Sequence, residues 1–264
     1  MIQNILANKS SKLFIVLAGF FIANALIAEL MGVKLFSLEA TFGYEPVQWV
    51  INHTPFSFTL TAGVILWPIV FIMTDIINEY YGVKGVRFLS YFTVVLIVFA
   101  FLIFQLAIHT TPAGFWVGNY TKQGVPDANK AFSMIFGQGQ WIIIGSLIAF
   151  LLGQIIDVTV FHKIKKVTGE KGIWFRATGS TLVSQLIDSF VVLFIAFYIG
   201  PRISNQQDDL WSINKVIGIC IGNYMYKVVM AIVLTPAVYG VHAIIEKYLG
   251  KALATEMKQN AMKQ

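Results

Sequence analysis

Six stretches of about 20 mostly apolar residues recur along this chain of 264 residues. We place them at residues 13–31, 56–77, 88–108, 141–161, 177–199 and 213–234. A stretch of this length spans the hydrocarbon core of a bilayer as a helix, because lipid offers the backbone N–H and C=O groups no other partner. The pattern therefore predicts an all-α integral membrane protein, a single domain over residues 1–264 with six transmembrane helices.

The composition excludes a water-soluble fold. Apolar residues make up 57% of the chain and charged residues only 12%, whereas a soluble domain carries about 25% charged residues. The net charge of +6 does not indicate nucleic-acid binding, because the basic residues lie between apolar runs instead of clustering on one solvated face. We therefore expect the lipid bilayer as the main partner and no nucleic acid.

The distribution of basic residues predicts the orientation, since short basic loops stay on the cytoplasmic side. One side of the membrane receives Lys9, Lys12, Lys84, Arg87, Lys163, Lys165, Lys166, Lys171, Arg176, Lys247, Lys251, Lys258 and Lys263. The other side receives only Lys34, Lys122, Lys130, Arg202 and Lys215. Both termini are thus expected in the cytoplasm, with residues 237–264 as an amphipathic or disordered basic tail.

Polar residues at the end of the second span share one helical face. Asp75, Asn78 and Glu79 follow one another at spacings of three and four residues, which places them together on a helix. A charge inside a membrane costs at least about 2.5–3.5 kcal/mol, so such residues indicate a shared polar interior. The alternative is a helix end that already lies in water.

The fourth and fifth spans each carry an amide followed three residues later by an acid. The pairs are Gln154 with Asp157, and Gln185 with Asp188. Each pair projects from one stripe of its helix and is a candidate for substrate binding. The alternative is that these side chains hydrogen-bond neighbouring helices without meeting a ligand.

The sixth span contains Asn223, Tyr224 and Lys227. Lys227 lies too deep to reach the interface easily and requires a carboxylate partner, either in a binding site or in a purely structural Asp–Lys pair. A carboxylate beside an amide suits the edge of an amidine- or guanine-like heterocycle, and Trp67 or Tyr224 could stack on its faces. These residue types leave amino acids, cations and small vitamins open as well.

Several of these residues stand in motifs that resemble a known family. Residues 74–82 read TDIINEYYG and are followed by Gly85-Val86-Arg87. Together with the two Gln/Asp pairs, Arg176, Ser180 and the Tyr226-Lys227 and Thr235-Pro236 pairs, this order resembles the queuosine precursor transporters, also called vitamin uptake transporters. The resemblance covers residues 60–240.

The resemblance implies a multi-pass protein of the cell inner (plasma) membrane, with six transmembrane helices, that imports a 7-deazapurine precursor of the tRNA nucleoside queuosine. Candidate cargoes are the cyano base, the aminomethyl base and queuine. As hypotheses, Asp188 or Asp157 would accept the N–H pair of the base, and Gln185 and Gln154 would bind its carbonyl and remaining amide positions. Asp75 or Glu79 would receive a cationic amine.

Other functions have weaker support in the sequence. No phosphate-binding G-x-x-x-x-G-K-[ST] motif is present, so ATP dependence would require a partner, as for the substrate-binding subunit of a multi-component vitamin importer. Another small-molecule or ion carrier is a further alternative. The four His residues lack metal-ligand spacing, so we expect no metal, no cofactor and no enzyme activity. A homodimer stays open.

Overall fold

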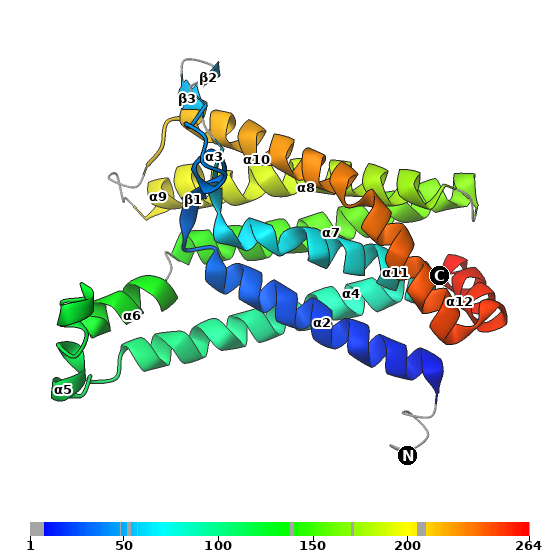
Figure 1. The fold of residues 1–264 in the computed structure, drawn as a ribbon, viewed down its shortest axis with the longest axis horizontal. Coiled ribbons are helices and arrows are strands. Elements are labelled where there is room, and N and C mark those ends of the chain that lie inside the picture. The colour runs from blue at the N-terminus through cyan, green and yellow to red at the C-terminus, as the bar shows by residue number, and fades with distance from the viewer. Residues whose placement is uncertain are drawn as a thin grey trace.

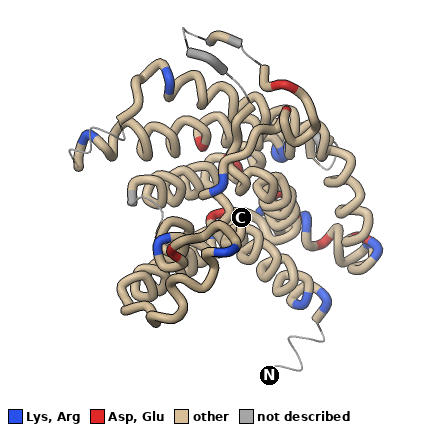
Figure 2. The backbone as a smooth tube through the Cα atoms, turned by 60° about the vertical axis from the view of Figure 1, so that its left-hand side comes forward, with Lys and Arg blue, Asp and Glu red and all other residues tan. Residues whose placement is uncertain are grey.

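Long helices dominate the computed structural model, which describes residues 8–47, 49–51, 54–56, 58–137, 140–169, 172–204 and 210–263 (Figure 1). Five segments of this part of the chain are helices long and apolar enough to cross a membrane. They are built on α2 (Lys9–Met31), α4 (Trp67–Ile108), α7 (Gln140–Thr168), α8 (Ile173–Phe194) and α10 (Ile213–Val233). The long helices carry few charged residues, as the mostly tan tube in Figure 2 shows.

Helix α4 accounts for two of the predicted spans. Its 42 residues would measure about 63 Å if straight, roughly twice the hydrocarbon thickness of about 30 Å. Instead the helix doubles back at Gly82, whose φ of 71° and ψ of −173° are non-helical (Figure 1). A backbone of this kind is open almost only to glycine. Gly82 thus divides α4 into a first arm, residues 67–81, and a second arm, residues 83–108.

The predicted second span, 56–77, begins too early. Helix α4 starts only at Trp67, and Pro68 occupies its first turn, where the fixed φ of proline favours helix initiation. The residues before it form strand β4 (Thr59–Thr61), which pairs antiparallel with β1 (Leu35–Ser37). Apolar content alone does not separate an extended buried segment from a helix, which is why the prediction of a start at residue 56 was wrong.

A close approach fixes the chain just before α4. The 3-10 turn η1 (Ala62–Ile65) lies against α2, and a Cβ atom at Gly63 would collide with the carbonyl oxygen of Ala28. Only glycine fits here without a shift of backbone. Turn η1 therefore packs closely on α2 at the end of the bundle that carries β1 and β4.

The remaining short elements lie in connections between the long helices. They are α3 (Leu38–Thr41), β2 (Trp49–Ile51), β3 (Thr54–Phe56), α5 (Gly114–Val117), η2 (Thr121–Gln123), α6 (Ala128–Phe136), the π-helical turn η3 (Ile195–Ile199) and α9 (Gly200–Ile203). The other predicted spans coincide with helices: 13–31 with α2, 88–108 with the second arm of α4, and 141–161 with α7. The span 177–199 matches α8 with η3, and 213–234 matches α10 to within one residue.

The predicted tail is helical throughout its described residues. Helix α11 (Thr235–Leu249) and helix α12 (Lys251–Met262) join at Gly250. The two helices are tied together by Lys258, which donates to Glu246 at 2.5 Å, and α12 packs on α4. Residues 237–249 and 251–262 of the predicted tail are thus helical.

Both ends of the described chain lie at the same end of the bundle (Figure 1). Lys9 Nζ, at the start of α2, donates to the backbone oxygen of Tyr248 near the end of α11 at 3.1 Å. The buried core between these helices is apolar and includes Phe21, Val70 and Ile77. The second arm of α4 leaves large apolar side chains such as Leu102 and Leu106 exposed, as expected for a surface solvated by lipid.

Candidate substrate-binding site

A pocket of about 500 Å³, its mouth included, lies between the first arm of α4, α8 and α10. We call it the central pocket. Its polar lining consists of Asp75, Thr178, Thr181, Gln185, Tyr226 and Lys227. Its apolar lining consists of Val64, Trp67, Pro68, Phe71, Ile72, Ala177, Met230, Ala231, Leu234 and Val238. This mixture of apolar walls with a few polar groups is typical of a small-molecule site.

Two buried polar side chains of the central pocket have unused hydrogen-bonding capacity. Asp75 is 3% exposed, and its Oδ1 atom has no hydrogen-bond partner in the described structure. Gln185 is 2% exposed, and neither its Oε1 nor its Nε2 atom has one. Leaving such groups unpaired costs about 1–3 kcal/mol each. A ligand that supplies the missing donors and acceptors would recover this free energy.

Helical spacing places an aromatic wall beside Asp75. Trp67, Phe71 and Asp75 follow one another every four residues along the first arm of α4, so they share one face. The rings of Trp67 and Phe71 stack with centroids 6.0 Å apart and an interplanar angle of 26°. A planar ligand could extend this stack while its edge reaches Asp75.

A second pocket, of about 1320 Å³ with its mouth, lies at the end of the bundle that carries β1 and β4. We call it the strand-side pocket. Its polar lining includes Glu29, Ser146, Asp188, Ser189, Asn223 and Lys227. Trp67 and Lys227 line both pockets. The ion pair of Lys227 with Asp188 therefore stands at the boundary between the two, and Lys227 has the carboxylate partner that its depth required.

Gln154 and Asp157 are buried but line neither pocket. Thr74 Oγ1 donates to Gln154 Oε1 at 3.1 Å, which links α4 to α7. Ser184 Oγ donates to Asp157 Oδ1 at 3.2 Å, which links α8 to α7. These contacts agree with the alternative in which the polar groups connect helices, although Asp157 Oδ2 has no hydrogen-bond partner in the described structure.

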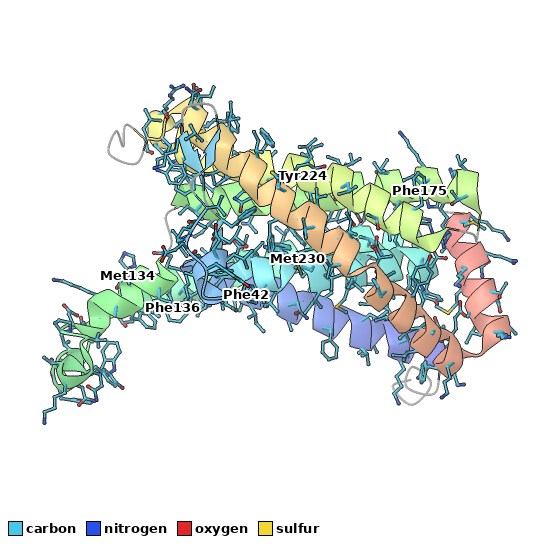
Figure 3. The ribbon with its side chains drawn as sticks, turned by 45° about the horizontal axis from the view of Figure 1, so that its top comes forward. Phe42, Met134, Phe136, Phe175, Tyr224 and Met230 are labelled. Carbon is cyan, nitrogen blue, oxygen red and sulfur yellow. The ribbon has the colours of Figure 1, made fainter. Side chains whose placement is uncertain are left out.

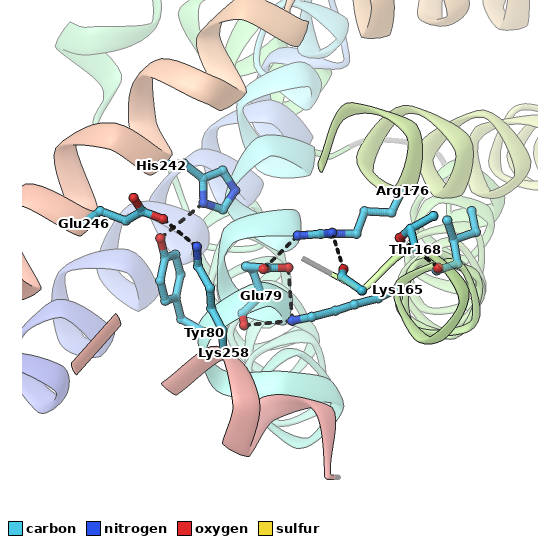
Figure 4. Close-up of polar contacts among 10 residues, drawn as sticks. Glu79, Tyr80, Lys165, Thr168, Arg176, His242, Glu246 and Lys258 are labelled. Carbon is cyan, nitrogen blue, oxygen red and sulfur yellow. Dashed lines mark hydrogen bonds and ion pairs between the residues drawn. The ribbon is translucent and has the colours of Figure 1, made fainter. Parts of the chain in front are cut away.

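Glu79 lies in a buried ion cluster with Lys165 and Arg176 (Figure 4). Its Oε1 atom is 2.8 Å from Arg176 Nη2, and its Oε2 atom is 3.1 Å from Lys165 Nζ. All three side chains are at most 1% exposed. The alternative of a solvated helix end is therefore wrong for Glu79, and its charge is already balanced by two cations.

The comparison with protein families decides what kind of protein this is. Residues 61–241 match the family model described as "Putative vitamin uptake transporter". The chain belongs to this transporter family. The resemblance indicated by residues 74–87 is confirmed, and the protein is a multi-pass membrane transporter, not an enzyme.

Curated relatives of the transporter cover most of its length. It is 28% identical to the "Probable queuosine precursor transporter" of Bacillus subtilis, over 72% of the chain and 75% of that protein. It is also 28% identical to the "Queuosine precursor transporter" of Escherichia coli, over 78% of the chain and 81% of that protein. A relative from Haemophilus influenzae is 26% identical. No solved structure matches the chain.

The transporter thus brings together only part of the predicted site. Trp67, Asp75, Gln185 and Lys227 line the central pocket, whereas Asp188 and Asn223 line the strand-side pocket. The other candidates line neither of the two pockets: Asn78, Glu79, Gln154, Asp157 and Tyr224. Among the described residues, no three His, Cys, Asp or Glu side chains gather in a way that could hold a metal ion.

Sequence reasoning missed several polar contacts of the transporter. Glu29 accepts a hydrogen bond from Ser146 in the strand-side pocket. The sequence analysis places Lys165 among the basic residues between spans. In the structure it lies on α7, two helical turns beyond Asp157, and forms an ion pair with Glu79. That spacing was the available signal, but only the packing of α7 against α4 identifies the partner.

Proposed function

We propose that this transporter imports a queuosine precursor, a 7-deazapurine that keeps the hydrogen-bonding edge of guanine, through the central pocket. The names of the relatives from three bacteria support the cargo class. The observation that carries the proposal is the unpaired polar capacity of Asp75 and Gln185 beside the Trp67 and Phe71 stack.

The chemistry of this edge fits these two side chains. A 7-deazaguanine presents a ring N–H and an exocyclic amine side by side, and a carboxylate can accept both hydrogen bonds. Its carbonyl accepts a hydrogen bond from an amide N–H. We therefore assign the N–H pair to Asp75 and the carbonyl to Gln185, with the ring stacked on Trp67. This assignment replaces the sequence-based hypothesis, in which Asp157 or Asp188 accepts the N–H pair.

Glu79 is a poor acceptor for the amine of an aminomethyl base, because Lys165 and Arg176 already occupy its two oxygens. Glu29 in the strand-side pocket is a better candidate for an approaching cation. This division predicts that the neutral cyano base depends on Asp75 and Gln185 alone. The cationic base depends on Glu29 in addition.

Six membrane crossings are part of the proposal. The two arms of α4 count as separate crossings, which together with α2, α7, α8 and α10 gives six and returns both termini to one side. The surplus of basic residues favours the cytoplasmic side of the inner membrane for that end. Helix α2 would then begin in the cytoplasm, and helix α12 would end there.

The only cysteine makes this topology testable. Cys220 is buried, so Cys220→Ala provides a background without thiols. We expect Met262→Cys in that background to react with a membrane-impermeant maleimide only after the cells are permeabilised. Asp127→Cys, in the connection between the second arm of α4 and α7, should react in intact cells. Labelling of both, or of neither, from outside would contradict six crossings.

Uptake by the purified protein in liposomes tests the function itself. The substrates are labelled 7-cyano-7-deazaguanine, 7-aminomethyl-7-deazaguanine and queuine, with guanine as competitor. We expect saturable uptake of at least one, lost in Gln185→Ala and retained in the matched control Gln123→Ala, which lies in the connection at η2. Binding without uptake would favour a subunit of a multi-component importer. No binding would refute the proposed cargo.

A further inference from the structure

The buried carboxylates of the bundle differ in their cationic partners. Glu79 has two, Lys165 and Arg176, and Asp188 has Lys227. Asp75 and Asp157 form no ion pair with any Lys, Arg or His among the residues that the structure describes. An ionised carboxylate buried without a counter-charge is costly. The negative charge of these two groups must therefore be removed in another way, such as by protonation.

Asp157 is the more deeply enclosed of the two. It is fully buried, Ser184 Oγ donates to its Oδ1 atom at 3.2 Å, and the hydroxyl of Ser180 also interacts with its carboxyl group. Both neighbours are neutral hydroxyls, so neither supplies a counter-charge. A protonated carboxyl keeps one oxygen as an acceptor and needs no counter-ion, which matches this environment.

The charged groups around Asp157 come from each neighbouring helix. Helix α4 contributes Asp75, which interacts electrostatically with Asp157 itself, with Glu79 of the same helix and with Arg176 of α8. Asp188 of α8 faces α7 one helical turn away, near Gly153, and is paired with Lys227.

Two more distant contributions complete the surroundings. Lys165 lies further along α7 itself and binds Glu79. Lys258 of α12 and His242 of α11 lie on the side of Glu79 opposite to Lys165 and Arg176, and both interact electrostatically with this cluster (Figure 4). Lys258 is paired there with Glu246. Neither Lys258 nor His242 contacts Asp157.

Charge balance in this interior calls for one proton. The cluster around Asp157 holds three carboxyl groups, those of Asp75, Asp157 and Glu79, against two cations, Lys165 and Arg176. With all five groups ionised, one negative charge would remain uncompensated in this cluster. A single proton shared by Asp75 and Asp157 removes it, since two neighbouring buried carboxylates do not both ionise readily.

We propose that Asp75 and Asp157 form a proton-binding pair that couples substrate uptake to proton entry, with Asp157 holding the proton while Asp75 binds substrate. The inference rests on the proposed function. Asp75 lines the central pocket and accepts N–H groups best as a carboxylate, whereas Asp157 lies behind it and meets no ligand. The proton passes from external water to a carboxyl oxygen of the pair and leaves to internal water, so no bond other than O–H forms or breaks.

Asp157→Asn tests the pair, because asparagine imitates the protonated carboxyl in shape and charge. In liposomes loaded with unlabelled substrate, we expect exchange of labelled 7-cyano-7-deazaguanine to stay within about twofold of the parent. Accumulation driven by an inward proton gradient should vanish in the variant, whereas the parent accumulates up to about tenfold per pH unit for one coupled proton. Ser184→Ala, which keeps the carboxyl and removes its donor, should still respond to the gradient.

The outcomes separate this inference from the proposed function. Parent uptake that ignores the proton gradient, or a gradient response that survives in Asp157→Asn, overturns the proton pair and leaves the transporter assignment intact. Absence of any uptake or exchange by the parent overturns the assignment itself, and the pair with it. If Asp157→Asn does not fold, a pH indicator inside liposomes of the parent decides: one proton entering per substrate supports the pair, and substrate entry without protons refutes it.

Discussion

Asp75 and Glu79 lie one helical turn apart on the same face of α4, yet their surroundings differ. Glu79 forms ion pairs with two cations, Lys165 and Arg176. Asp75 forms no ion pair with any residue that the structure describes, and it lines a pocket with one oxygen unpaired. Burial alone therefore does not distinguish a structural acid from a binding acid. What distinguishes them is whether the protein itself satisfies the group.

The strongest test of this contrast is Glu79→Gln. Removing one member of a buried ion cluster leaves Lys165 and Arg176 without their counter-charge, which costs about 3–5 kcal/mol. We expect a large fall in the thermal unfolding midpoint of the purified protein in detergent. The matched control is Glu246→Gln, since Glu246 is 42% exposed and such pairs contribute about 0–1 kcal/mol. Equal midpoints for the two variants would remove the structural role of Glu79.

Asp75→Asn should show the opposite behaviour. We expect substrate affinity to fall by about 10- to 100-fold, the loss of a charge-assisted hydrogen-bond pair worth about 1.5–3 kcal/mol. The unfolding midpoint should stay equal to that of the parent or rise, because no native contact to Oδ1 is lost. Binding measured by scintillation proximity, together with the midpoint, checks both. A destabilised variant with normal affinity would make Asp75 structural.

A third test concerns the helical pair α11–α12, drawn in faint orange and red in Figure 3. His242 of α11 and Lys258 of α12 lie near Glu79 (Figure 4). Burial, above all, lowers the pKa of His242 to about 4, and Tyr80 Oη lies 3.3 Å from its Nδ1 atom. The docked helix therefore keeps His242 neutral, whereas the undocked state binds a proton below its ordinary pKa of about 6.5. Docking should weaken as pH falls through the interval from 6.5 to 4, by about 2 kcal/mol at pH 5.

Hydrogen-exchange protection of residues 235–262, corrected for the intrinsic rates, checks this prediction. The parent should lose about 20-fold in protection between pH 7 and pH 5, and His242→Gln should lose much less over the same interval. Identical pH dependence in the two proteins would show that His242 does not control docking.

The smallest effect is expected for the pair at the boundary of the two pockets. Lys227 and Asp188 are 13% and 19% exposed, so water in the strand-side pocket can partly solvate either charge. Lys227→Met and Asp188→Asn should each lower stability by about 1 kcal/mol, and the double variant should recover part of that loss. Strictly additive losses in the double-mutant cycle would show that the two charges do not interact.

Much of the fold follows from the sequence, because lipid imposes one solution on a long apolar stretch. The helices α2, α7 and α10 coincide with predicted spans for this reason, although α7 continues seven residues beyond its span. The reversal at Gly82 falls in the predicted connection between the spans 56–77 and 88–108. The strand at Thr59–Thr61 did not follow from the sequence, because strand pairing depends on how β4 meets β1. The same limit applies to residues 56–66, whose apolar character suits a strand as well as a helix.

The sequence by itself determined the membrane class, the family and the set of polar residues that must avoid lipid, since these depend on composition, length and local spacing. Only the tertiary structure decided which of those residues satisfy one another. Lys165 reaches Glu79 from 86 residues away, and Ser184 reaches Asp157 from 27. Pairing across helices is a property of packing and not of local sequence. Asp75 and Gln185 are proposed as binding residues because the structure shows that they line the central pocket with polar atoms left unpaired.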